Sequence, residues 1–315
     1  MIRAIPRNFV RYGKVRKRRH PSLLVQQAHT LFLRTLLVVG GCLALAFVSH
    51  AQRQFDQSKE IGLALGTSYY LGDINPGKHL GGRLSAGYGA YYRHNFSRRI
   101  SLRINYFQGR VEAWDADSPN PWQQNRNLHF RNDISEMSVL AEINYLDHQL
   151  GNPGDRFTAF LFAGLGVFNH MPEAEFNGQW TPLQPLGTEG QGTTWAEAYG
   201  VESYGTSGIS MPIGFGFKSN LGPFTTFCFD WGVRKTWTDY LDDVSGIYAD
   251  RGVLLQEKGP TTASLADRSE VTEGGVLNQG GMQRGDPSRA DVFGFVSASL
   301  SFRISKKPTT CWSEI

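Results

Sequence analysis

The chain has 315 residues, of which 32 are Lys or Arg, 28 are Asp or Glu, and 36 are glycine. It holds three cysteines, too few for a disulfide-stapled scaffold, and their spacing fits no zinc site. Nine basic residues and no acidic residue fall within residues 1–51, which leaves 23 basic against 28 acidic residues, so the overall basic balance is no sign of nucleic-acid binding.

The first 51 residues predict an export signal. The basic run "KVRKRR" at 14–19 precedes the apolar stretch "TLLVVGGCLALAFV" at 35–48, which is too short for a typical membrane-spanning helix. Ser49 and Ala51 are small residues placed for cleavage after Ala51, with Gln52 next. We therefore expect a basic leader and signal peptide over 1–51 and a short N-terminal segment over 52–58. Beyond the signal, Cys228 and Cys311 remain, and they could pair in an oxidising compartment.

Eight segments beyond residue 58 alternate apolar residues with small or polar ones. A period of two places the two sets of side chains on opposite faces of an extended chain, which indicates β-strands. In the first segment, for example, Leu63 and Leu65 alternate with Ala64 and Gly66. Pro212 lacks the N–H that a strand ladder needs, so we expect a local bulge there. The predicted strands are 59–70, 83–94, 100–111, 128–145, 156–170, 209–218, 224–236 and 291–304.

The polarity of the two faces distinguishes a membrane barrel from a soluble sandwich. In a sandwich the apolar face packs inward and the polar face meets water, and single segments fit that interpretation. Taken together, however, the apolar faces are rich in Tyr and Trp near segment ends, while the opposite faces mix glycine with isolated charges. This arrangement favours a small transmembrane barrel, with lipid-facing residues outside and a compact polar interior.

The connections between the predicted strands alternate between long and short. Outer-membrane barrels follow this rule, with short periplasmic turns and longer outer loops, and closure pairs every backbone group as lipid demands. The short connections are 96–99, 146–155 and 220–223, and the long ones are 71–82, 112–127, 171–208 and 237–289. The sequence therefore predicts an all-β, eight-stranded antiparallel transmembrane β-barrel in the outer membrane over 59–304. Both termini are expected in the periplasm, with a periplasmic tail over 305–315.

The interior of an eight-stranded barrel is narrow enough for side chains to fill. Its predicted inward positions carry both signs of charge in nearly matched numbers. Because buried charges are tolerated only when paired and hydrogen-bonded, we predict a charge network that closes the lumen, with a proton or ion path as the functional alternative. The predicted network consists of Arg83, Arg93, Arg103, Glu136, Glu142, Asp230 and Arg234, and the same inward set includes Glu60, Arg156, Lys218 and Arg303.

The stretch "WGVRKTWTDYLDDVSGIYAD" at 231–250 concentrates acidic residues where a strand ends. A calcium loop places Asp or Asn at alternate positions with a glycine and a distal Glu, and this spacing is absent. We therefore favour a strand exit over a metal or catalytic site, with the carboxylates capping turns or pairing with Arg234 and Lys235. The loop 251–289, rich in Gly, Ser, Thr and charge, is expected to be mobile.

The sequence gives little support for an enzyme. His129 and His170 are the strand-borne candidates for catalysis, near Asp133 and Glu173, but no nucleophile motif accompanies them. The glycine-rich "PLGTEGQG" at 185–192 does not join a strand to a helix, as a phosphate-binding loop would. We predict no catalytic residue, no metal ligand and no cofactor.

Six stretches of the sequence occur in the same order as in one known family and resemble it. The resemblance covers about residues 59–304. Together they are similar to the PorG-type outer-membrane barrels of Bacteroidota, which are associated with the type IX secretion system. The basic leader and the tail "SKKPTTCWSEI" lie outside the resemblance. The stretches are "SYYLGDINP" (68–76), "RNLHFRNDISE" (126–136), "FLFAGLGVFNHMPEA" (160–174), "LQPLGTEGQG" (183–192), "MPIGFGFK" (211–218) and "WGVRKTWTDYLDDVSGIY" (231–248).

The resemblance implies a non-enzymatic component of that secretion system. Its expected partners are outer-membrane lipid and the periplasmic lipoprotein ring, with no nucleic acid among them. Two other functions remain: a stand-alone structural or adhesive barrel that binds ligands through its outer loops, and an outer-membrane enzyme. The partner contacts would have to be periplasmic, and the candidates are Ser97, Arg98, Arg99, Asp147, Asp155, Lys306 and Lys307.

Overall fold

The computed structural model describes residues 55, 57–80, 82–269 and 278–304, all within one compact unit that begins at Phe55. The predicted leader, its cleavage site between Ala51 and Gln52, and the predicted tail from residue 305 lie outside the described residues. Within the described part of the chain, no helix is both long enough and apolar enough to cross a membrane.

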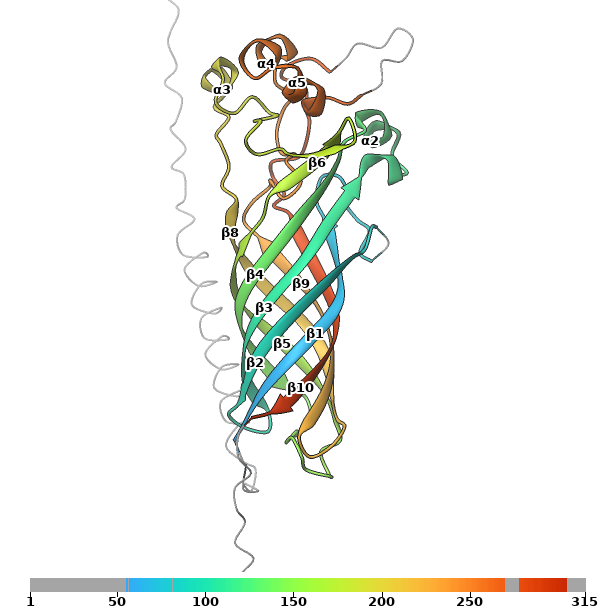
Figure 1. Ribbon diagram of the computed structural model, residues 1–315, viewed down its shortest axis with the longest axis vertical. Coiled ribbons are helices and arrows are strands. Elements are labelled where there is room, and N and C mark those ends of the chain that lie inside the picture. Colours follow the sequence, from blue (N-terminus) through green and yellow to red (C-terminus); the bar gives the residue numbers. More distant parts are fainter. Residues whose placement is uncertain (1–54, 56, 81, 270–277, 305–315) are drawn as a thin grey trace, which may run out of the picture. The chain divides into compact units, whose positions relative to one another are not determined.

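Eight long antiparallel strands close into a barrel (Figure 1). Neighbours along the barrel pair in the order β3-β2-β1-β10-β9-β8-β5-β4, and pairing of β3 with β4 closes the ring. The predicted fold class is therefore confirmed, and each predicted strand is found with its ends within three residues of the expected ones. The barrel strands are β1 (Ser58–Leu71), β2 (Ser85–Asn95), β3 (Ile100–Trp114), β4 (His129–Asn144), β5 (Phe157–Asn169), β8 (Ser207–Asn220), β9 (Thr225–Thr236) and β10 (Val292–Arg303).

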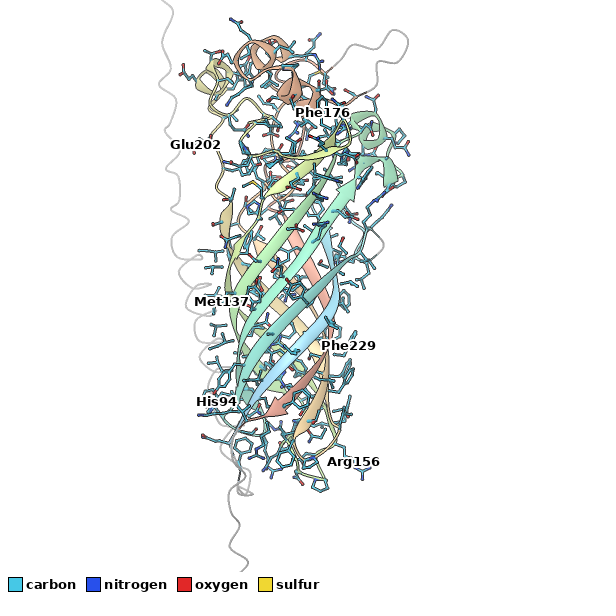
Figure 2. The ribbon with its side chains drawn as sticks, viewed as in Figure 1. His94, Met137, Arg156, Phe176, Glu202 and Phe229 are labelled. Carbon is cyan, nitrogen blue, oxygen red and sulfur yellow. The ribbon has the colours of Figure 1, made fainter. Side chains whose placement is uncertain are left out.

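The outer wall of the barrel is an apolar belt. Alternate residues of β1 point outward. Leu63 and Leu65 are 66% and 72% exposed, whereas Glu60, on the opposite face of the same strand, is buried. The same alternation runs through the other strands, and Figure 2 shows Met137 and Phe229 among the side chains that project from the wall. A continuous belt of exposed Leu, Ile, Val and Phe around a closed sheet is the surface that a lipid bilayer requires.

Glycines on the inward positions make room for large side chains in the lumen. A Cβ atom at Gly62 would lie 2.2 Å from the ring of Tyr91, which is on the neighbouring strand β2. Tyr91 can fold across the interior only because no side chain stands at this position. The high glycine content thus serves interior packing in the strands, in addition to turns.

The bulge predicted at Pro212 is not found. The β5–β8 register pairs Ala163 with Ile213 and resumes at Gly166 with Ser210, so no residue is inserted between these pairs. The ladder is interrupted on the β5 side only, since Pro212 pairs in register with Arg234 of β9 on its other side. The missing N–H therefore costs ladder contacts to one neighbour without shifting the strand.

The four long connections fold into a dome at one end of the barrel (Figure 1). We use dome for these connections together with the strand ends that they contact. The hairpin of β6 and β7 extends the barrel sheet, because Glu173 of β6 pairs with Arg131 of β4. The dome elements are the 3₁₀ helix η1 (Asp115–Asp117), α2 (Pro121–Arg126), β6 (Pro172–Phe176), β7 (Gln179–Pro182), α3 (Thr194–Tyr199), α4 (Arg251–Glu257) and α5 (Pro260–Ala266).

The dome has an apolar core of its own. Val111, Phe130, Leu241 and Phe293 belong to one buried cluster that fills the barrel mouth. Loop residues 251–269 form α4 and α5, and Leu254 and other residues of these helices pack in a second buried cluster. The described part of the 251–289 loop thus contains two packed helices that the sequence did not indicate, while Leu255 and Met282 remain exposed, and its mobility stays a prediction.

Candidate functional site

Three carboxylates and three cations form one buried network inside the lumen, and a further buried ion pair lies nearer the dome. Glu142 of β4 is at its centre and faces three cations. Its carboxylate oxygens lie 3.0 Å from Arg93 Nε and 3.2 Å from Arg103 Nε, and it accepts a hydrogen bond from Lys218 Nζ. Arg93, Arg103 and Lys218 come from β2, β3 and β8, so the contacts of one side chain tie four strands together.

The remaining members extend the network towards both ends of the lumen. Arg93 also lies 3.3 Å from Glu60, and Arg103 lies 2.8 Å from Asp230. Nearer the dome, Arg234 and Glu136 form a pair of their own, 3.6 Å apart. Hydroxyl groups satisfy further carboxylate oxygens, with Ser301 donating to Glu60, Ser297 to Asp230 and Ser210 to Glu136. Every buried ion here has a partner of opposite charge, as buried ions require, although the Nε atoms of Arg93, Arg103 and Arg234 make no hydrogen bond to any described residue.

The structure places six of the seven predicted network residues in the lumen, and one elsewhere. Arg93, Arg103, Glu136, Glu142, Asp230 and Arg234 are all buried there. Arg83 is not a member, because β2 begins only at Ser85 and Arg83 belongs to the preceding connection. Its guanidinium pairs with Asp117 at 2.7 Å in an exposed position and covers the ring of Trp114. Arg156, from the same predicted inward set, is exposed at the end opposite the dome (Figure 2).

Side chains fill the lumen around this network. A cavity bordered by Tyr91, Arg103 and Asp230 has a volume of only about 10 Å³, close to the space that one water molecule needs. Cys228 is buried in the same region as a free thiol, and its sulfur lies 3.6 Å from Arg93 Nη1. Its suggested partner Cys311 lies outside the described residues. The lumen is therefore a packed interior at this level.

A second buried polar network seals the dome. The hydroxyl of Tyr70 lies 2.5 Å from Asp242 Oδ2 and 2.7 Å from Asp291 Oδ1. One hydroxyl hydrogen cannot serve two carboxylates, so the arrangement is favourable when one carboxyl is protonated and donates to the Tyr70 oxygen. Burial raises the pKa of both Asp242 and Asp291 well above the usual range, and their mutual proximity raises that of Asp291 further.

Asp243 joins two of the long connections, 171–208 and 237–289, in the same network. Its carboxylate accepts hydrogen bonds from Thr188 and from Tyr204, and it lies 3.7 Å from Arg284. Arg284 also contacts Glu189 at 3.0 Å, and these carboxylates hold its pKa above its ordinary value although burial opposes its charge. Burial raises the pKa of Asp243 to about 6. Contacts between residues this far apart in the chain hold the dome closed.

The acidic stretch at 231–250 forms a strand exit, and one detail of its prediction is wrong. Asp242 caps a turn by accepting from the Val244 amide at 2.9 Å, and Asp250 caps the start of α4 by accepting from the Val253 amide at 3.0 Å. The carboxylates do not pair with Arg234, which points into the lumen towards Glu136. Among the described residues, no group of three or more His, Cys, Asp or Glu side chains is arranged to hold a metal ion.

The two candidate histidines are packing residues in separate surroundings. His129 stacks on Trp114 with ring centroids 4.6 Å apart, and its Nε2 accepts from the Glu175 amide. His170 is buried and its Nδ1 lies 3.3 Å from Asn132 Nδ2. The neighbouring acids face arginines instead of these rings, since Asp133 pairs with Arg110 and Glu173 with Arg131.

The short connections meet at the other end of the barrel, which we call the turn end. Arg98 pairs with Asp155 at 2.8 Å and Arg99 with Asp147 at 2.7 Å, so two predicted turns are joined by two ion pairs. Ser97 Oγ accepts from the amides of Arg99 and Ile100 and shapes the tight turn. Five of the predicted contact residues thus share one surface, while Lys306 and Lys307 lie outside the described residues.

Sequence reasoning missed the cations that close the dome. Arg126 is buried against Asp115, with two nitrogen–oxygen distances of 2.7 Å, and it also donates to the backbone oxygens of Arg284 and Asp73. Arg284 lies in a loop with no periodic pattern, 95 positions from Glu189. The sequence pointed only to the acidic partners of Arg284, because Glu189 and Asp243 lie in the quoted stretches at 183–192 and 231–248.

Comparison with known proteins gives one family and a set of similar structures. Residues 38–179, less than half of the chain, match a family described as a domain of unknown function, DUF6089. No curated protein matches. Neither finding bears on the PorG-type resemblance, which stays a prediction.

The similar solved structures are outer-membrane barrels of low sequence identity. Neisserial surface protein A (NspA) is 8% identical with a TM-score of 0.37, and the match covers 79% of this chain and 99% of that one. OprG of Pseudomonas aeruginosa is 9% identical with a TM-score of 0.37, covering 81% and 100%. Ail, the attachment invasion locus protein of Yersinia pestis, is 12% identical with a TM-score of 0.33, covering 79% and 97%. The closed barrel itself rests on the strand pairing of this chain.

Proposed function

We propose that the protein is a non-enzymatic outer-membrane barrel of a type IX protein secretion system, where it associates with the periplasmic lipoprotein ring. The proposal includes that the barrel does not conduct ions or solutes, and the closed lumen is the observation that supports this. Glu142 and its three cations cross the interior, and the dome adds a second sealed layer above them. A barrel closed in this way acts through its surfaces, as an anchor or scaffold in the membrane.

The placement of the quoted sequence stretches supports the secretion role. The stretch at 68–76 supplies Tyr70 to the dome network, the one at 183–192 supplies Glu189, and the one at 231–248 supplies Asp242 and Asp243. Residues that resemble the PorG-type family therefore converge on one feature of the fold. This convergence supports the proposal that the stretches belong to a way of closing the barrel that the family shares.

The turn end supplies the contact surface in this proposal. With the signal peptide removed and the dome outside the cell, the turn end faces the periplasm, as short turns do in outer-membrane barrels. Its ion pair of Arg99 and Asp147 is half exposed on both sides. Pairs of this kind contribute about 0–1 kcal/mol to stability, so they can be altered without unfolding the barrel.

Capture of partners from gently solubilised outer membranes tests the proposal. The tagged wild-type protein is expected to recover a periplasmic lipoprotein together with other secretion components, identified by mass spectrometry. Arg99→Glu is expected to lower that recovery several-fold. Arg289→Glu is the matched control, because Arg289 forms an exposed ion pair with Asp286 in the dome. Recovery of the wild-type barrel alone would refute the secretion role.

The alternative is a stand-alone structural or adhesive barrel. The observation that favours it is the folded dome, which presents Trp122 and Tyr199 with about half of each side chain exposed. Aromatic residues of this kind are enriched at binding surfaces. Recovery of the barrel without partners, combined with binding of cells or matrix that is lost in Trp122→Ala, would support this alternative.

A further inference from the structure

Strand β3 rises into the dome further than its neighbour β2. The last pair between the two strands joins Gly87 to Gly109, whereas β3 continues to Trp114 and stays paired with β4 up to His129. The five residues of β3 from 110 to 114 are thus paired with a strand on one side only, although Ser85 and Ala86 at the start of β2 lie across the adjoining hollow. Figure 1 shows β3 and β4 continuing together towards α2.

The hydrogen-bond pattern tells which backbone groups of this edge are free. Odd-numbered residues along β3 form their backbone hydrogen bonds on the β4 side. At the two ends of the strand, Arg99 O accepts from Asn144 N, and Asp115 N donates to Leu128 O. Even-numbered residues form theirs on the β2 side, as Ile100 O does by accepting from Phe96 N. Because antiparallel strands alternate, Glu112 and Trp114 direct N–H and C=O away from β4. Within the described residues, no hydrogen bond to these four groups is found.

Two hollows run along this free edge. One, of about 610 Å³, is bordered by Ala113 and Trp114, and the other, of about 460 Å³, by Arg110 and Glu112. Both volumes fall in the usual range for ligand sites. Ile74, Pro76 and Ala113 give the larger hollow an apolar side, and Lys78 and Arg83 supply two cations against the single carboxylate of Asp117.

We propose that the β3 edge at Glu112–Trp114 is a docking site for an extended peptide segment of a partner protein, which adds as a strand beside β3. Unpaired strand edges bind peptides through main-chain hydrogen bonds, and the flanking hollows then select side chains. The lining residues favour a peptide with apolar residues at alternate positions and a carboxylate near Lys78 and Arg83. This inference does not depend on the proposed secretion role.

The other free edge of the extended sheet is less suited to this role. Strand β7 has four residues and ends at Pro182, which has no N–H to offer. Arg131 also lies over the ring of Trp180, the central aromatic residue of β7. The β3 edge has free donors and acceptors at two alternate residues and open space beside them, which β7 lacks.

One substitution removes the edge without disturbing the barrel ladder. Glu112→Pro deletes the N–H that faces away from β4, and proline is tolerated where a strand donor faces solvent. Glu112→Thr is the matched control, because it changes the same side chain and keeps the N–H. Unheated gel mobility equal to that of the wild type establishes that both variants are folded.

The probe is a labelled seven-residue peptide of alternating valine and threonine with one glutamate, added to the full protein in detergent micelles. Fluorescence anisotropy is expected to show saturable binding to the wild type and to Glu112→Thr, weakened about tenfold or more by Glu112→Pro. Hydrogen exchange on the wild type gives an independent measurement. The amides of Glu112 and Trp114 are expected to slow on binding, while those of Val111 and Ala113, bonded to β4, stay unchanged. Absence of saturable binding, equal affinity for Glu112→Pro, or unchanged exchange at Glu112 would overturn the proposal.

Discussion

Glu142→Gln removes the charge at the centre of the lumen network while keeping the shape of the side chain. Arg93 and Arg103 would still face Glu60 and Asp230, respectively. Lys218 would have only uncharged acceptors, the Asn144 Oδ1 at 3.1 Å and the amide oxygen of the new glutamine, with no carboxylate in contact. Breaking a buried ion pair and leaving one charge uncompensated costs about 3–5 kcal/mol, which is the destabilisation we expect.

The free energy of unfolding is measured by urea titration in detergent micelles, followed by tryptophan fluorescence and by gel mobility of unheated samples. Lys218→Met in the Glu142→Gln background removes the unpaired cation, so it is expected to recover about 1–3 kcal/mol. Asp147→Asn is the control for an exposed pair and is expected to cost less than about 1 kcal/mol. A Glu142→Gln protein within about 1 kcal/mol of the wild type would refute the network as the element that holds the lumen closed.

Three further predictions concern the dome and the lumen wall. Burial raises the pKa of Asp239 from 3.8 to about 7, so its folded form binds a proton more tightly than the unfolded form and dome stability should fall as pH rises from about 4 to about 7. Protease cleavage of the dome should therefore be faster at pH 8 than at pH 5, and Asp239→Asn should reduce that difference; equal rates in the wild type would contradict this. Arg126→Ala leaves Asp115 buried without its cation and should cost about 3–5 kcal/mol, seen as rapid proteolysis of the dome in an intact barrel. Gly62→Ala forces Tyr91 from its place and should lower the unfolding free energy by about 1–3 kcal/mol in the same urea assay.

The barrel could be predicted from sequence because its determinants are local. A period of two fixes which residues face lipid, and the same parity placed Glu142 and Asp230 inside correctly. Arg83 fits the parity as well, but parity holds only within a strand, and β2 starts two residues later. Residue parity does not reveal where a strand starts, and Arg83, just outside β2, pairs with Asp117 in another connection.

The dome could not be predicted because its determinants are distant in sequence. Helices α3, α4 and α5 have six or seven residues, too short for an amphipathic pattern and too short to be stable alone. They are held by distant contacts, such as the hydrogen bond from Thr194 of α3 to Glu257 of α4 and the one from Arg284 to the Ala266 carbonyl of α5, which no local spacing reveals. The strand exit of the acidic stretch could be predicted from its spacing, yet its partners come from distant segments, Tyr70 from strand β1 and Tyr204 from the connection before β8.

The central claim is that the barrel is closed and acts through its surfaces. The most direct test is the conductance of the purified protein in planar lipid bilayers. With a porin reconstituted in the same way as positive control, the wild-type protein is expected to give no channel events above the baseline of the bare bilayer. A steady, reproducible unit conductance from the wild-type protein would contradict the closed lumen and the function proposed from it.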